Sequence, residues 1–183
     1  MKTRRKMFLF AGLVFGFLLL LPASASAQQQ AVWTHAAAAC TIDEDSSSKH
    51  EFLGGRMRLK GTNTGTIVAR CNVANPMDNG GNPGWQWASL EVVYADPDGR
   101  GLNNQVIATL YKVHNSNGGV SEVGKFDSNN FDTNNNLEPK SVLINHPFDF
   151  YSYAYYVEIQ VKRSNSTDTP SVSIVRLRNT PIE

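Results

Sequence analysis

Five aromatic residues have positions that would suit the binding of a sugar. Trp85 and Trp87 are two residues apart in an extended segment, and Tyr151 and Tyr153 repeat this spacing. Side chains two apart on a strand point to the same side, so each pair would present two flat rings together. Tyr156 falls on the polar side of its own segment. Sugars pack on such rings, so the sequence predicts a ligand surface here, although for Trp87 a place in a sandwich core fits equally well.

Asp96-Pro97-Asp98-Gly99 places two carboxylates at a spacing that can share one hard cation. Calcium is therefore a candidate ligand of Asp96 and Asp98, and the sequence indicates no other cofactor. The same four residues are also typical of a tight turn, in which Pro fixes φ, Asp bonds to the backbone and Gly takes a positive φ. The turn is the simpler interpretation, and calcium stays open beside it.

The residues that could catalyse a reaction are scattered along the chain. The four histidines form no His-x-His or His-Glu-x-x-His motif, and Gly-x-Ser-x-Gly is absent from the sequence. Glu91 and Glu158 fall on the polar sides of two predicted strands, and a glycosidase needs two carboxylates about 5 to 10 Å apart. An exposed sheet face also carries such glutamates. The sequence therefore favours a non-catalytic protein over a small hydrolase.

Cys40 and Cys71 are the only cysteines of the chain. In an oxidising compartment such a pair ordinarily forms a disulfide. A metal site or redox pair is the weaker interpretation, because the sequence has no Cys-x-x-Cys and no paired histidines near these residues. We expect a structural bridge that ties the N-terminal segment to the first well-defined strand.

Short segments of strand character, bounded by Gly, Asn, Asp and Pro, must position these residues. In the clearest of them, Tyr155, Val157, Ile159 and Val161 alternate with polar residues. Further strands are expected over residues 56–60, 66–71, 87–94, 106–113, 120–126, 141–144 and 172–177. About eight short strands with polar loops predict an all-β fold, an antiparallel β-sandwich or jelly roll.

Residues 1–27 have the features of a secretory signal peptide. A basic start is followed by an apolar run that ends at Leu21 and by the small residues Ala25-Ser26-Ala27. Cleavage near Ala27 would give a secreted or periplasmic protein that does not span a membrane. Residues 28–50 are then expected to be an extended N-terminal arm, and residues 51–183 the β-sandwich domain.

The charge of the chain depends on this leader. Its removal takes away four positive charges and no negative ones, so the formal net charge falls from +1 to −3. An exported protein of negative net charge is not expected to bind nucleic acid. The 17 asparagines all follow the leader, mostly in the predicted loops.

Several features of the chain occur together: Trp33-Thr34-His35, the cysteine pair, Tyr94-x-Asp96-Pro97-Asp98-Gly99 and a final hairpin. This combination resembles small exported bacterial β-sandwich proteins that carry no assigned function. The resemblance covers most of the chain after residue 27. It implies the compartment and the fold, and it transfers no active site.

These observations together predict a secreted, non-catalytic β-sandwich that binds a glycan or another cell-surface polymer. The alternative is a structural or assembly protein of the cell envelope or exterior, which would contact its partners through sheet edges and the N-terminal arm.

Overall fold

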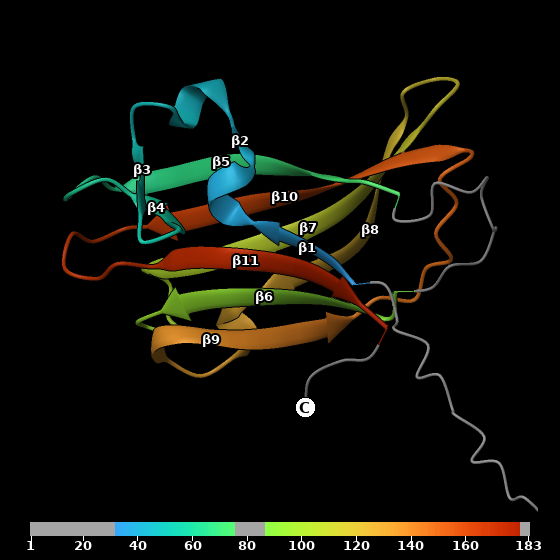
Figure 1. The fold of residues 1–183 in the computed structure, drawn as a ribbon. Coiled ribbons are helices and arrows are strands. Elements are labelled where there is room, and N and C mark those ends of the chain that lie inside the picture. Colours follow the sequence, from blue (N-terminus) through green and yellow to red (C-terminus); the bar gives the residue numbers. More distant parts are fainter. Residues whose placement is uncertain (1–31, 76–86, 180–183) are drawn as a thin grey trace, which may run out of the picture.

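The computed structural model describes residues 32–75 and 87–179, which form two antiparallel sheets packed as a sandwich (Figure 1). The first sheet has six strands, in the spatial order β3 (His50–Leu53), β4 (Arg56–Leu59), β11 (Ser171–Arg178), β6 (Ser89–Asp96) and β9 (Asn134–Leu143), with β1 (Trp33–Ala36) also paired to β11. The second sheet has five strands, in the order β2 (Thr41–Ile42), β5 (Gly65–Val73), β10 (Tyr153–Arg163), β7 (Asn104–His114) and β8 (Val120–Asp127). The prediction of an all-β antiparallel sandwich is confirmed.

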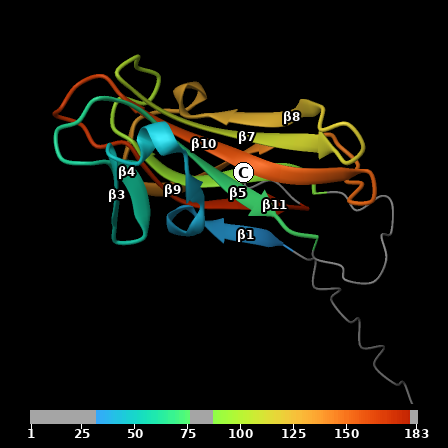
Figure 2. The same cartoon turned by 90° about the horizontal axis from the view of Figure 1, so that it is seen from above.

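The strands β4 to β11 have the topology of a jelly roll. Among them, the first sheet has the order β4-β11-β6-β9 and the second the order β5-β10-β7-β8. Two interlocked Greek keys produce this arrangement. Figure 2, turned by 90°, shows β7, β8 and β10 in one layer and β1 and β11 in the other.

The inward faces of the two sheets form the core. The alternation predicted for β10 is observed, because Tyr155, Val157, Ile159 and Val161 are buried while the residues between them reach the outer face. The same alternation buries Leu90, Val92 and Tyr94 of β6 and Val106, Ala108 and Leu110 of β7. Burial of apolar area at about 25 cal/mol per Å² drives the two sheets together.

Some strands lie outside the segments that the sequence pattern marks. Strand β9 begins at Asn134, whereas the pattern predicts a strand only over residues 141–144. The part of β9 before Ser141 is mostly polar and contains Pro139, which an edge strand tolerates because, among the described strands, one side of the β9 backbone has no partner. The short strands β1 and β3 are also additions, and each pairs with a strand of the first sheet.

The segment predicted as an N-terminal arm crosses from one sheet to the other. Strand β1 pairs with β11 of the first sheet, and after η1 (Ala37–Ala39) strand β2 pairs with β5 of the second. The predicted disulfide is present at this crossing and joins Cys40, directly before β2, to Cys71 of β5. The bridge therefore holds the start of the sandwich against both sheets.

Replacing both cysteines by serine should lower the free energy of unfolding by about 3 to 4 kcal/mol, because the bridge closes a loop with a sequence separation of 31. Urea denaturation of wild type and of the double variant Cys40→Ser/Cys71→Ser measures this difference. Wild type under reducing conditions should match the double variant. A loss under about 1 kcal/mol would contradict the stabilising role of the bridge.

Candidate functional site

The outer face of the second sheet gathers aromatic and polar side chains around its central strand β10. Odd-numbered residues of β10 point into the core, so the even-numbered ones point outward. Residues directly opposite on neighbouring strands share that face. Two rows result from the register, Asn72–Tyr156–Tyr111 and Arg70–Glu158–Thr109, with Gln160 beside the second row. We call these seven residues the β10 face.

Tyr156 and Tyr111 form a stacked pair on the β10 face. Their ring centroids are 5.2 Å apart and the ring planes differ by 27°. Both side chains are half-buried, and each covers one face of the other. The sequence analysis identified Tyr156 and missed Tyr111. Tyr111 is one of the outward-facing residues of β7, and this position could have indicated an exposed ring. Ile107 faces the same way, and an apolar residue there made this side of the strand look less polar.

An ion-pair network lies next to the two tyrosines. Arg70 Nε donates to Glu158 Oε2 at 3.0 Å, and Arg70 Nη1 donates to Asp43 Oδ2 at 2.7 Å. Gln160 Nε2 donates to the other Glu158 oxygen at 3.0 Å. The bond to Asp43 is the main cause of a raised pKa of Arg70, and partial burial with the nearby Glu158 carboxylate raises the pKa of Tyr156. The network thus holds charged and amide groups in place beside the rings.

Trp87, one residue of the predicted tryptophan pair, is not on the surface. Trp87 is fully buried, with its ring packed edge-on against Phe148 at 4.7 Å and Phe150 at 6.2 Å between centroids. The prediction that Trp87 contacts a ligand is therefore wrong, because its apolar ring completes the end of the core. Trp85 lies outside the described residues.

Tyr151 and Tyr153 differ in their surroundings. Tyr151 is 89% exposed in the loop before β10. Tyr153 packs partly against the core and lies between Lys112, whose Nζ is 4.7 Å from the ring centroid, and His114. Tyr153 shares the odd alternation of Tyr155 rather than the even one of Tyr156, so the structure does not bring it onto the β10 face.

A buried hydrogen-bond network anchors the loop that carries Tyr151. The Tyr155 hydroxyl accepts a hydrogen bond from the backbone N–H of Asp149 at 3.0 Å, and it lies 3.0 Å from His146 Nε2. The hydroxyl proton can donate to Nε2 of a neutral His146, and the second acceptor position of the hydroxyl oxygen equally suits an Nε2–H donor. Burial is the main cause of the lowered pKa of His146, and the charge of Lys112 adds to it.

Asp96 and Asp98 are brought together at the opposite end of the sandwich. Asp96 ends β6 and is fully buried, whereas Asp98 lies in the following turn and is half-buried. The Asp98 carboxylate accepts the backbone N–H groups of Asn103 at 2.9 Å and Asn104 at 3.1 Å, as the turn interpretation predicts. Gly99 has the positive φ expected of it, +57°.

Glu91 and Glu158 do not face each other. Glu91 lies on the outward alternation of the first sheet, and Glu158 lies on the outer face of the second. Glu91 is also fully buried. Arg176 Nη1 and Arg178 Nη1 donate hydrogen bonds to its two carboxylate oxygens at 2.9 and 2.6 Å. A glycosidase would need these two carboxylates across one cleft, and their placement on opposite faces excludes this pair as its acid and base.

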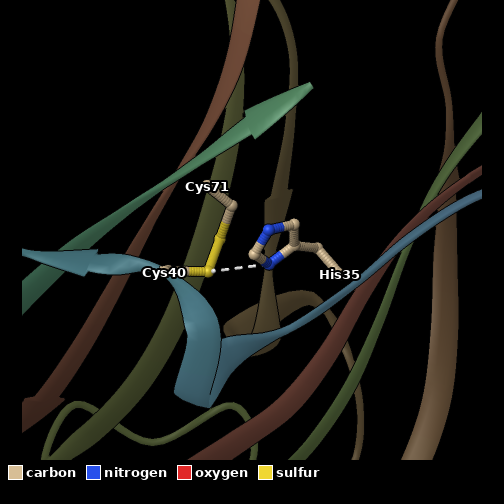
Figure 3. Close-up of side chains that lie close together, drawn as sticks. All are labelled: His35, Cys40 and Cys71. Carbon is tan, nitrogen blue, oxygen red and sulfur yellow. Dashed lines mark hydrogen bonds between the residues drawn. A yellow bond between two sulfur atoms is a disulfide. The ribbon is translucent and has the colours of Figure 1, made fainter. Parts of the chain in front are cut away.

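His35 lies beside the disulfide, as Figure 3 shows. Its Nδ1 is 3.5 Å from Cys40 Sγ, and the donor atoms of His35, Cys40 and Cys71 all lie within 4.8 Å of one another. This spacing would suit a soft metal ion if both sulfurs were thiolates. In the disulfide the sulfurs carry no such charge, so the group is a structural bridge.

Comparisons with known proteins give little further information. No family model and no curated protein matches the chain. One similar solved structure is a family 11 carbohydrate-binding module from Clostridium thermocellum, in complex with a β-1,3-1,4-mixed-linked tetrasaccharide. The identity is 8%, the TM-score is 0.39, and the match covers 83% of this chain and 91% of that one. At this level the similarity carries no argument about a ligand.

Within residues 32–75 and 87–179, no helix has the length and hydropathy to cross a membrane.

The network around His146 predicts a pH-dependent stability. Since the pKa of His146 is lower in the folded protein than its ordinary value of about 6.5, its stabilising effect is complete above that pH and is lost as the pH falls below it. Thermal unfolding from pH 7.5 to pH 5 should therefore show a smaller drop in Tm for His146→Gln, which keeps an acceptor, than for wild type. His50→Gln controls for the loss of an imidazole elsewhere. Equal drops in wild type and His146→Gln would contradict the prediction.

Proposed function

We propose that the chain is an exported, non-catalytic β-sandwich that binds a glycan on the β10 face. The stacked pair Tyr111–Tyr156 is the observation that carries the proposal. Each ring keeps one face that the other ring does not cover, and an apolar sugar face can pack on such a surface. Two adjacent rings on an open sheet suit an extended polysaccharide chain.

The polar groups beside the rings support the same ligand class. Asn72 is exposed next to Tyr156, and Glu158 and Gln160 lie two and four residues further along β10 on the same side. Amide and carboxylate groups that are already held by a network lose little side-chain entropy when they bond to hydroxyl groups. The face carries one cation, Arg70, and one acid, Glu158, and Arg70 also pairs with Asp43 beside the face, so a neutral polysaccharide fits it better than a strongly charged one.

The wider properties of the chain are consistent with an extracellular role. The disulfide is typical of an oxidising compartment, and the features of residues 1–27 predict export, although those residues lie outside the described part. The placement of Glu91 and Glu158 on opposite faces supports binding rather than hydrolysis.

The test is affinity electrophoresis and calorimetry of wild type against soluble neutral polysaccharides, followed by variants of the β10 face. Tyr156→Ala and Tyr111→Ala should each weaken binding by about fivefold, since a stacking ring contributes roughly 1 kcal/mol. Tyr156→Phe keeps the ring and should retain most of the affinity.

Tyr151→Ala is the matched control, because Tyr151 is 89% exposed and lies off the β10 face. Unchanged affinity in Tyr151→Ala together with weakened affinity in Tyr156→Ala supports the proposal. If Tyr151→Ala abolishes binding and Tyr156→Ala does not, the ligand binds at the loop before β10, and the proposed surface is incorrect.

A second function, assembly through sheet edges, is favoured by the hairpin β3–β4. Strand β3 is an edge of the first sheet, and Phe52 and Leu53 on it are 41% and 56% exposed. Gly54 and Gly55 supply the two positive φ values of a tight type I′ turn, so the hairpin is well defined. Exposed apolar residues on an unpaired edge are suited to pairing with another strand.

Size-exclusion chromatography with light scattering over a range of protein concentrations tests this second function. Wild type should self-associate at high concentration, and Phe52→Ser/Leu53→Ser should remain monomeric. Leu102→Ser, which removes an 81% exposed leucine elsewhere, is the control. A strictly monomeric wild type would count against assembly with a second copy of the chain.

A further inference from the structure

The carboxyl group of Asp96 is buried without a partner. Asp96 has no exposed surface, and among the residues that the structure describes neither of its side-chain oxygens accepts a hydrogen bond of ordinary geometry, although the Ser128 hydroxyl, the Asp98 carboxyl group and the Asp98 backbone N–H lie close to them. Its backbone N–H donates to Asn134 Oδ1 at 2.6 Å, so the main chain at this position is satisfied while the carboxyl group is not. A buried polar group in this state costs several kcal/mol if it is charged.

Side-chain oxygens and the backbone N–H of Asp98 lie around the Asp96 carboxyl group. The Asp98 carboxylate and the Ser128 hydroxyl lie beside the Asp96 carboxyl group, and both affect its ionisation. Tyr94, two residues earlier in β6, has a buried hydroxyl without a partner, and its pKa is raised by burial and by the charge of Asp96. Asn104, whose backbone N–H bonds to Asp98, has a buried side-chain oxygen that likewise has no partner.

No basic side chain balances this group. Within the described part of the chain, no Lys, Arg or His forms an ion pair with Asp96 or Asp98. Arg163 is buried at the same end of the sandwich, but its guanidinium donates to the backbone carbonyls of Gly61, Asn63 and Asp168. Two adjacent carboxyl groups without a counter-charge need either a shared proton or a bound cation.

We propose that Asp96 and Asp98, together with the Ser128 hydroxyl, form a binding site for a calcium ion. A set of carboxylate and hydroxyl oxygens matches the ligand preference of this hard cation. These ligands come from the end of β6, the following turn and η3 (Ser128–Asn130), which follows β8 of the other sheet. The ion would therefore link the two sheets at the end of the sandwich away from Trp87.

Calcium titration of the full chain after treatment with EDTA tests the site. At a calcium concentration about 100-fold above Kd, the Tm of wild type should rise by roughly 5 to 10 °C. Calorimetry should show one site per chain. Terbium, which replaces calcium in such sites, should give luminescence sensitised by the nearby tyrosine, and calcium should displace it.

Asp96→Asn removes the central carboxylate and should abolish the calcium-dependent rise in Tm. Asp132→Asn is the matched control, because Asp132 is an acid whose side chain is 91% exposed, paired with Arg100 outside the site, and this variant should keep the full response. If Asp96→Asn does not fold, the calcium response and terbium signal of wild type still decide the question.

Two outcomes overturn the proposal. One is a wild type with no change in Tm and no binding heat in millimolar calcium. The other is an equal calcium response in wild type and Asp96→Asn. If Asp96→Asn also melts higher than wild type in EDTA, the two acids share a proton in place of a cation. The site lies at the end of the sandwich rather than on the β10 face, so its failure leaves the glycan proposal intact.

Discussion

The register between β10 and its neighbours β5 and β7 is the constraint on which the core and the proposed binding surface both depend. It turns Tyr155 and Val157 toward the first sheet and Tyr156 and Glu158 outward. A slip of one residue would exchange the two sets, exposing Tyr155 and burying the Glu158 carboxylate. The free energy gained by burying the apolar set therefore also fixes the polar set. The stack of Tyr156 on Tyr111 follows from the pairing that builds the core.

Buried polar groups in this sandwich are balanced in different ways. Glu91 accepts hydrogen bonds from Arg176 and Arg178, and Arg163 donates to three backbone carbonyl groups. Each of these charges has partners that offset the loss of water. Asp96 differs, because its oxygens have no such partner within the described residues. This difference gives cation binding a physical reason at Asp96 that exposed acidic residues lack.

The features with a proposed role lie on separate parts of the fold. The β10 face belongs to the second sheet, the hairpin β3–β4 to one edge of the first, and Asp96 to the end of the sandwich. The disulfide joins the segment between the first and second sheets to β5 and so keeps the layers in place (Figure 3). Because these features share few residues, a substitution at one of them leaves the others largely unchanged.

Local pattern determined the strands from β4 to β11, apart from the polar part of β9 before Ser141, and the antiparallel sandwich, because the alternation of apolar and polar residues is a property of neighbouring positions. A single cysteine pair, in a chain whose leader predicts export, likewise predicted the disulfide. Tertiary structure alone decided that Tyr111 meets Tyr156, that Trp87 is buried and that Glu91 and Glu158 lie on opposite faces. These outcomes depend on strand register and sheet order, which join residues far apart in the chain, and no short segment encodes them.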